Sequence, residues 1–414
     1  MGTSHHTGKF KQRFEQARRF VAPLLQQTGR PLNKMRALEV GCGEGPKTCA
    51  LAPMFKEYVG IDLDADGLAM GVANAEALNI TNADLRLQEA EDLPDILANE
   101  QFDVIFLYAV LEHLTISERL ETLRLCWEAL PPDGLLYIGE TPNRIAPIDY
   151  HSSRLPYLNL LPPELAQHFI DRSSHESWRN RVRSEETIEL GLYRNGQHVG
   201  FEEFDLSIAP PEELGAHLIA DNWSEPMMNL YPLRWFEPRN LNDFEVLCQS
   251  GFHTQPLPSM FARYWIEGIL AKTAPKKPLP TIRFLTPTMV RAKDKQAKRI
   301  VPDRLGVPIQ RLRNGEAIDC HIDAQATEVM LGISEGSQGK MKLILDGAPF
   351  GTFTTDELRA ANEGLWTLQS WKRIPLPTGA KTKFLRKPTG PKPKTLRIIA
   401  DCKDWIGICP PFVR

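Results

Sequence analysis

The sequence predicts an α/β protein in which a doubly wound parallel sheet with an inserted cap precedes a second, all-β domain. Strand-like apolar runs alternate with helical segments from about residue 36 to residue 142, the pattern of parallel strands joined by crossover helices. The alternation then stops in a long stretch rich in Pro, His, Trp and Arg, and the chain ends in short apolar runs broken by Gly, Asp and Pro. At 414 residues the chain is too long for one ordinary core, so at least two domains are expected.

An N-terminal helix is predicted within residues 1–34. From Phe10 to Gln27 apolar residues recur near helical spacing, and Gly29 and Pro31 end the pattern. Such a helix packs one face on the body of the protein.

The sheet domain is predicted over residues 35–272. Helices are expected from Pro46, around residues 70–78, through residues 120–127 and at NLNDFEVLCQSGF, residues 240–252. The expected strands are ALEV, YVGIDL, ADLRLQ, FDVIFLYA, GLLYIGE and ARYWIEGILA.

The break in this pattern, about residues 143–238, predicts an insertion that caps one end of the sheet. A loop of that length in a compact domain is usually functional. Residues 273–305 are dominated by Pro and Lys and are predicted to be a linker. Residues 306–414 are predicted to form a β-rich, sandwich-like accessory domain.

Charge is distributed unevenly along a chain whose formal net charge is only −3. From Ala271 onward there are about 26 Lys and Arg against about 13 Asp and Glu, so the tail is basic and the body acidic. No apolar run approaches the roughly 20 residues of a membrane span and the first residues lack a signal-peptide core, so a cytoplasmic location is expected.

Metal and disulfide chemistry are not expected. The seven Cys form no CxxC pair and have no His at metal-ligand spacing. Half of the ten His fall in the predicted cap, and their spread argues against one shared metal site. They are His151, His168, His175, His198 and His217.

The segment LEVGCGEGPKT carries the first chemical signal. Glycines after a strand supply unusual backbone angles and close approach to a ligand. A dinucleotide fingerprint would need glycine at position 46, where the chain has Pro46, and a phosphate loop would need a longer spacing before Lys47. Glu39, Glu44 and Asp62 surround the loop, which favours a cationic ligand over pyrophosphate.

Five motifs in order resemble those of the class I S-adenosylmethionine-dependent methyltransferases, closest to the group that contains ubiquinone-pathway and sugar O-methyltransferases. They are LEVGCGEG, VGIDLD, LRLQEAEDLP, FDVIFLYAVLEHL and LPPDGLLYIGETPN. The resemblance covers residues 35–143 and 240–272, and it implies a Rossmann-like sheet of seven strands with S-adenosyl-L-methionine as the cofactor.

The resemblance also implies roles for individual cofactor-binding residues. Glu39 would face the methionine ammonium group, and Asp62 would hold the ribose hydroxyls with Leu63 beside the adenine. Glu89 stands where the family usually has Asp to receive the adenine amino group. The loop residues that would wrap the cofactor, and those that would meet it through backbone, are Gly41, Cys42, Gly43, Gly45, Ala90 and Tyr108.

A hydroxyl acceptor would gain from a base, and His113 follows the fourth strand at the edge where ligands of such sheets bind. In several related O-methyltransferases a His near this place is the base. The alternative is a His that orders the pocket wall. Tyr150 and His151, in the polar run after the fifth strand, are further catalytic candidates, with simple loop packing as the alternative.

Sequence reasoning favours O-methylation of a sugar hydroxyl in a surface glycan or glycolipid precursor, because the run TPNRIAPIDYHSS resembles enzymes of surface-polysaccharide gene clusters. A phenol or quinone acceptor is the alternative, and a non-catalytic cofactor- or glycan-binding scaffold is a third hypothesis. The basic tail also suits an anionic polymer or a membrane surface. Enzymes that methylate nucleic-acid bases carry characteristic residues at the fourth strand, where this chain has LYAV. The sequence therefore does not favour a nucleic-acid substrate.

Overall fold

The computed structural model describes residues 3–221, 258–275, 283–284, 288–291, 300–302, 308–322, 328–333, 337–361, 370–376, 394–403, 406–408 and 412–413. The described residues up to 275 belong to one compact unit, and those from 283 onward belong to a second. None of the described helices combines the length and the apolar character that a bilayer span requires.

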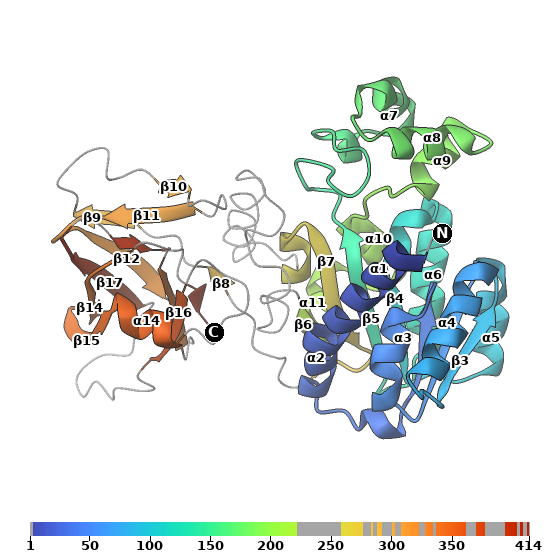
Figure 1. The fold of residues 1–414 in the computed structure, drawn as a ribbon, viewed down its shortest axis with the longest axis horizontal. Helices are drawn as coiled ribbons and strands as arrows, with labels where there is room; N and C mark the ends of the chain where they lie inside the picture. The colour runs from blue at the N-terminus through green and yellow to red at the C-terminus, as the bar shows by residue number, and fades with distance from the viewer. Residues whose placement is uncertain are drawn as a thin grey trace. The chain divides into compact units, whose positions relative to one another are not determined.

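The first unit is built on one sheet with the strand order β3-β2-β1-β4-β5-β7-β6 (Figure 1). The strands β1 to β5 run parallel, and β7 is antiparallel to both of its neighbours. The predicted Rossmann-like sheet of seven strands is confirmed within the described residues. Its strands are β1 Arg36–Val40, β2 Glu57–Asp62, β3 Ala83–Leu87, β4 Val104–Tyr108, β5 Leu135–Pro142, β6 Leu218–Asp221 and β7 Trp265–Ala271.

The central strands are near-continuous apolar runs because helices cover both faces of the sheet (Figure 1). On one face lie α5 Leu93–Asn99, α6 Ile116–Ala129, α10 Phe201–Ser207 and α11 Pro211–His217, which share a buried core with the sheet. On the other face an aromatic row links Tyr58, Phe106 and Tyr137 across the strands.

The predicted N-terminal helix is present as a nearly continuous helical segment. It comprises α1 Thr3–Gln16, a π-helical turn over Ala17–Val21, and α2 Ala22–Gln27. α1 packs on α3 Pro46–Leu51, the helix that follows the glycine loop. α4 Ala65–Ala77 follows β2, and Asp64 caps its N-terminus.

The cap is smaller than predicted. A separate core around Leu158, Trp178 and Val182 defines it. The predicted boundary of 143–238 is too wide, because α10, α11 and β6 all return to the sheet; their buried side chains Phe204, Leu214 and Leu218 join its core. The cap helices are α7 Pro163–Ala166, α8 Glu176–Ser184 and α9 Ile188–Arg194, with short 3-10 turns at Leu158–Leu160 and Gln167–Arg172.

The second unit consists of two antiparallel sheets that share one buried core, as predicted for a sandwich-like all-β part. The segment predicted as a linker contributes three of its short strands, because it holds the apolar residues Met289, Val290 and Ile300 among its basic ones. The described strands are β8 Arg283–Phe284, β9 Thr288–Arg291, β10 Ile300–Pro302, β11 Pro308–Leu312, β12 Ala317–Ile322, β13 Glu328–Ile333, β14 Lys340–Leu345, β15 Ala348–Thr354, β16 Ser370–Pro375, β17 Lys394–Asp401, β18 Ile406–Ile408 and β19 Phe412–Val413, with α14 Thr355–Ala361.

One predicted helix, NLNDFEVLCQSGF at residues 240–252, lies outside the described residues.

Candidate active site

The glycine loop after β1 takes the backbone conformation that the sequence predicts. Gly41, Gly43 and Gly45 have φ angles of 74°, 52° and 71°, a region that favours glycine. The Gly41 and Cys42 amides donate to the carbonyl of Ile61 at the end of β2, at 2.8 and 3.1 Å. These bonds hold the loop across the carboxyl ends of two adjacent strands, where ligands of such sheets bind.

The Cys42 thiol packs inside this loop. The side chain is buried, and a Cβ atom placed on Gly60 would lie 3.0 Å from its sulfur. Burial raises the pKa of Cys42, so the thiol stays protonated near neutral pH. Any contribution of Cys42 to a cofactor would therefore come from its backbone.

Asp62 is fixed by two backbone donors. The Gly43 amide donates to Oδ2 at 2.7 Å, and the Asp64 amide donates to Oδ1 at 2.9 Å. Each oxygen keeps a free lone pair for a further donor, as a pair of ribose hydroxyls would supply. The next residue, Leu63, is 74% exposed, which leaves an apolar side chain beside this carboxylate.

Glu39 lies buried beneath the loop with half of its carboxylate unused. Its Oε2 accepts from the hydroxyls of Thr48 and Tyr58, at 2.6 and 3.1 Å. Its Oε1 is buried and has no hydrogen-bond partner within the described part of the chain. Burial raises the pKa of Glu39, with the charge of Lys47 acting against that rise. An unpaired buried acceptor is costly, and a ligand ammonium group would satisfy it.

Lys47, in the first turn of α3, makes buried contacts that the sequence did not predict. Its side chain is buried, Nζ lies 3.6 Å from the centre of the Tyr108 ring, and it donates to the Tyr108 carbonyl at 3.4 Å. Burial lowers the pKa of Lys47, while the charge of Glu39 raises it. The Tyr108 carbonyl, predicted to meet the cofactor, has Lys47 as a donor here.

The remaining predicted cofactor residues follow β3. Glu89 is exposed, and its amide donates to Asp92 at 3.0 Å. Ala90 begins the 3-10 turn Ala90–Asp92. The Gln88 amide donates to the Asp62 carbonyl at 3.0 Å, so this segment runs beside the carboxylate that follows β2. The structure thus brings the predicted cofactor residues to one edge of the sheet, and their individual roles remain predictions.

Three ligand-type side chains converge where β4 ends. Glu112 and His113 lie in the turn Leu111–His113, and His151 comes from the loop after β5. Glu112 Oε1 is 3.9 Å from Nε2 of each histidine. The cluster adjoins the glycine loop, because a Cβ atom on Gly41 would lie 2.6 Å from a methyl group of Val110.

Burial differs sharply across this cluster. The side chains of Glu112, His151 and His113 are 0%, 25% and 49% exposed. Burial raises the pKa of Glu112 to about 8 and lowers that of His151 to about 4. Burial also lowers the pKa of His113, so both imidazoles are neutral near pH 7.

Sequence reasoning predicted His113 and His151 as separate candidates and expected no metal site, and it did not connect them to Glu112. The available signal was their position after β4 and β5, since the carboxyl ends of neighbouring parallel strands share one edge. Tyr150, the third catalytic candidate, is half-buried, with its ring 6.1 Å from that of Tyr264. Burial raises its pKa, so it stays protonated.

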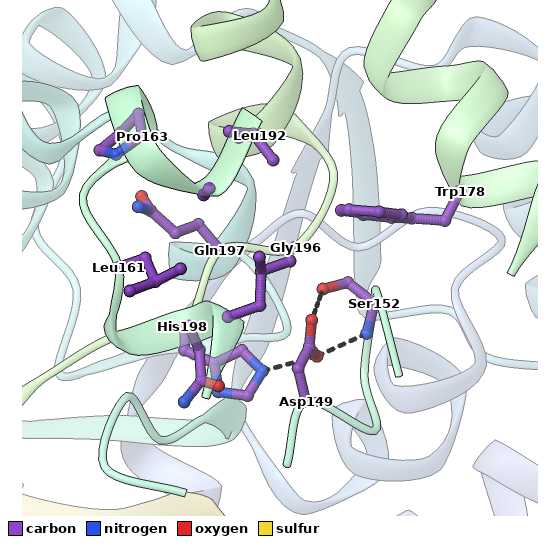
Figure 2. Close-up of a pocket in the computed structure, with 12 residues that line it drawn as sticks. Asp149, Ser152, Leu161, Pro163, Trp178, Leu192, Gly196, Gln197 and His198 are labelled. Atoms are coloured by element: carbon purple, nitrogen blue, oxygen red, sulfur yellow. Dashed lines mark hydrogen bonds and ion pairs between the residues drawn. The ribbon is translucent and has the colours of Figure 1, made fainter. Parts of the chain in front are cut away.

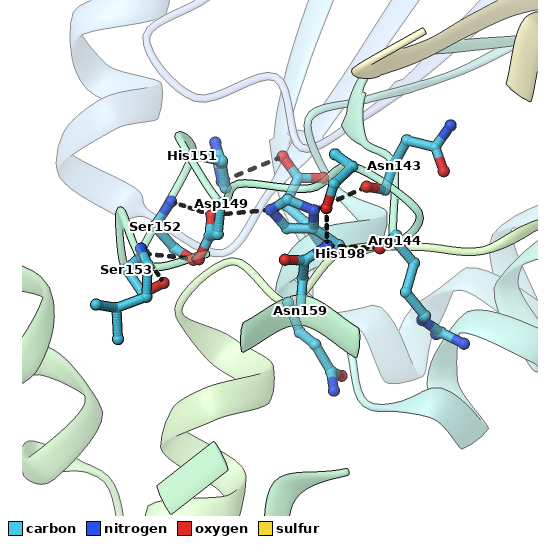
Figure 3. A network of polar contacts seen from close by, with 12 residues as sticks. Asn143, Arg144, Asp149, His151, Ser152, Ser153, Asn159 and His198 are labelled. Carbon is cyan, nitrogen blue, oxygen red and sulfur yellow. Dashed lines mark hydrogen bonds and ion pairs between the residues drawn. The ribbon is translucent and has the colours of Figure 1, made fainter. Parts of the chain in front are cut away.

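A buried polar network builds the loop that carries His151 (Figure 3). Asp149 accepts from His198 Nε2 at 2.8 Å, from the Ser152 and Ser153 amides at 2.8 and 2.7 Å, and from the Ser152 hydroxyl. Burial alone would raise the pKa of Asp149, but His198 and the serines outweigh it and hold the pKa below its usual range. Sequence reasoning did not connect Asp149 with His198, because 49 residues separate the two.

A cavity of about 30 Å³ lies beside this network, between Asp149, Trp178 and His198 (Figure 2). The unpartnered oxygens Asn159 Oδ1 and Gln197 Oε1 belong to residues that line it. A volume of this size holds one or two water molecules. It is too small for a sugar ring.

The Rossmann-like sheet, the left-handed glycine loop and the paired carboxylates Glu39 and Asp62 define the first unit as a nucleoside-cofactor domain. Residues 37–134 match the family profile described as "Methyltransferase domain". These residues of the first unit form a class I S-adenosylmethionine-dependent methyltransferase domain. S-Adenosyl-L-methionine is its cofactor, and the orphaned Glu39 Oε1 fits the ammonium group of that molecule.

The chain is similar to proteins named ubiquinone biosynthesis O-methyltransferase. It is 31% identical over 163 residues to the one from Ruegeria pomeroyi, covering 39% of this chain and 60% of that protein. It is 33% identical over 110 residues to the one from Azorhizobium caulinodans, covering 27% of this chain and 42% of that protein. The chain therefore matches less than two thirds of the length of these relatives.

Solved structures with a similar fold include an S-adenosylmethionine-dependent methyltransferase from Clostridium acetobutylicum, 15% identical with a TM-score of 0.30 over 34% of this chain and 55% of that one. Another is the N-terminal domain of EvdMO1 with SAH bound, 23% identical with a TM-score of 0.26 over 30% of this chain and 50% of that one.

Proposed function

We propose that this protein is an S-adenosylmethionine-dependent O-methyltransferase whose acceptor is a hydroxyl group, in the first place a sugar hydroxyl of a surface glycan or glycolipid precursor. One observation carries the proposal. His113 and His151 converge at the carboxyl edge of the sheet, and His113 lies three residues after Val110, which contacts Gly41. A hydroxyl acceptor gains from a base near its proton, and a neutral imidazole is suited to that task near pH 7.

The cofactor supplies an electrophilic methyl group on a positively charged sulfur. Glu39 and Asp62 hold the donor in one orientation, and alignment provides most of the rate enhancement in such an in-line displacement. When bound, the cofactor would supply the methyl group and leave as a neutral thioether, and His113 or His151 would take the proton of the acceptor hydroxyl. Tyr150, protonated and half-buried on the same loop, is a positioning group for the acceptor.

The sugar acceptor is supported by the cap sequence that follows β5 and by the polar character of its loop. A phenol or quinone acceptor is supported by the relatives of about 30% identity that are named for ubiquinone biosynthesis. A flat phenol would favour the aromatic side chains near the mouth, such as Tyr150, whereas a sugar would favour the cap's polar groups.

Transfer of a labelled methyl group from S-adenosylmethionine tests the acceptor class. The full chain is assayed with free sugars, glycan and glycolipid fractions, catechols and RNA. Labelling of the glycan fractions alone supports the sugar proposal, and labelling of catechols alone replaces it with the phenol proposal. A chain that binds the cofactor and labels none of these acceptors would instead be the non-catalytic binding protein of the third hypothesis.

We also propose that the basic C-terminal part of the chain contacts an anionic polymer or a membrane surface. Its support is the excess of Lys and Arg from Ala271 onward. Co-sedimentation with anionic and neutral vesicles, and retention on an anionic polymer matrix, test this proposal at two salt concentrations.

A further inference from the structure

We propose that Glu112, His113 and His151 bind a divalent transition-metal ion such as Mn²⁺ or Zn²⁺. Each residue offers one ligand atom, and these atoms lie within 4.8 Å of one another. Two imidazole nitrogens and one carboxylate oxygen form a ligand set that suits such ions and leaves coordination positions open.

The spacing of the three atoms fits an intervening ion. Glu112 Oε1 lies 3.9 Å from Nε2 of both His113 and His151, which is too far for a hydrogen bond. An ion about 2.0–2.2 Å from each ligand can bridge such a gap with only small side-chain movements. The gaps are therefore the right size for an ion and too long for direct pairing.

Glu112 gives an independent indication of a cationic partner. Its side chain is completely buried, and among the described residues neither carboxylate oxygen has a hydrogen-bond partner. Buried carboxylates in proteins are hydrogen-bonded, paired with charge or bound to metal. A cation between Glu112 and the two histidines would satisfy this carboxylate.

The surroundings orient the histidine nitrogens for this role. His113 Nδ1 lies 2.9 Å from the carbonyl of Arg194, at the end of α9. A carbonyl only accepts, so Nδ1 carries the proton and Nε2 presents its lone pair toward Glu112. The His151 amide donates to the Tyr264 hydroxyl at 2.6 Å, and Gly196 leaves room for the imidazole, because a Cβ atom there would lie 2.7 Å from the ring.

The side chain of His113 is half-exposed, so an ion bound in the cluster can take a further ligand from that side. Where the proposed function holds, an acceptor hydroxyl bound to the ion would lose its proton more readily, because a bound cation lowers the pKa of an oxygen ligand. With the ion bound, His113 and His151 would act as its ligands, and the ion would replace them as the group that activates the hydroxyl. This consequence rests on the proposed function. The binding of the ion does not.

Titration calorimetry on the full chain, stripped with a chelator and returned to chelator-free buffer, tests the site with Mn²⁺ and Zn²⁺ in the absence of S-adenosylmethionine. We expect one ion per chain. Glu112→Gln and His151→Asn are expected to weaken binding about 100-fold or more, since each removes a ligand. The matched control is His168→Asn, an exposed cap histidine outside the cluster, which leaves the affinity unchanged.

S-Adenosylmethionine binding is measured on the same samples. A wild-type chain that does not bind the cofactor counts against the proposed function, and a wild-type chain that does not bind the metal counts against this site. His113→Asn, on the exposed side of the cluster, keeps the test decisive if Glu112→Gln does not fold. Absence of a one-to-one metal complex in the wild-type chain overturns the proposal. Unchanged metal affinity in a folded His113→Asn or Glu112→Gln variant overturns it as well.

Discussion

Gly41, Gly43 and Gly45 each have a positive φ, so a side chain at any of these three positions would strain the loop that follows β1. The alternate spacing of these glycines already predicts such backbone angles. The burial of Lys47 over the Tyr108 ring was not predictable from the sequence, because its length lets it point either to solvent or inward. Its contacts with the ring and the carbonyl of Tyr108, at the end of β4, are what hold it in the inward position.

Gly41→Ala is expected to destabilise the protein more than Gly29→Ala. Both positions have nearly the same φ, 74° and 70°, so both variants carry the backbone cost of about 1–2 kcal/mol. Only at Gly41 would the added methyl meet another side chain, at 2.6 Å from Val110, and such overpacking costs about 1–3 kcal/mol more. Urea unfolding measures the difference, and equal losses would contradict the proposed contact.

Glu267 is expected to make stability fall as pH rises. Burial raises its pKa from 4.5 to about 8, so the folded state holds the proton more tightly than the unfolded state. The contribution of Glu267 to the free energy of unfolding is complete below about pH 4.5, where both states are protonated. It is lost progressively as pH rises through about 8. Between pH 5 and pH 9 the free energy of unfolding should fall for the wild type relative to Glu267→Gln, on the order of 4 kcal/mol.

The measurement is urea unfolding of both proteins at the two pH values. Glu128→Gln is the control, because that side chain is 59% exposed and its charge is solvated in both states. A pH dependence shared by the wild type and Glu267→Gln would show that Glu267 is ionised throughout this range.

At the scale of elements, the central strands were predictable and the cap was not. β1, β2, β4 and β5 are apolar runs bounded by turn residues, and each prediction is confirmed within a residue or two. β6 has only four residues and lies in a stretch rich in Pro and His, so no local pattern marks it. The meeting of His113 with His151 depends on the path of the cap, which is a tertiary property.

Asp149→Ala is expected to loosen the cap loop and to cost about 3–5 kcal/mol, because it leaves His198 and two serine amides without their buried acceptor. Thermal unfolding and limited proteolysis measure the effect. Asp171→Ala is the matched control in the same cap. The Asp171 side chain is 79% exposed, so its ion pair with Arg183 contributes at most about 1 kcal/mol to stability. A similar cost for both would contradict a structural role for the Asp149 network.

At the scale of the whole molecule, the chain combines a methyltransferase domain with a separate β-rich unit. Alternating strands and helices and the broken composition predicted that division. The start of the second unit was predicted too late in the chain. Residues 273–305 are rich in Lys and Pro and have few apolar residues, so they were predicted to be a linker, although they supply edge strands.

A chain truncated after Pro275 is expected to keep the cofactor affinity of the full chain within about two- to threefold, because the loop and its carboxylates all lie in the first unit. The truncated chain retains Lys272, whose Nζ donates to the Trp127 carbonyl at 2.7 Å. Calorimetry and methyl transfer to small acceptors check this. Loss of activity on polymeric acceptors alone would identify the second unit as a docking module.

Calorimetric titration of the full chain with S-adenosylmethionine, alongside Glu39→Gln and Asp62→Ala, tests whether the glycine loop binds the methyl donor. We expect one cofactor per chain. Each variant should bind about 10- to 100-fold more weakly, because each loses charge-assisted hydrogen bonds of about 1.5–3 kcal/mol. Absence of binding to the wild-type chain, or unchanged affinity in both variants, would contradict the assignment of this loop to the methyl donor.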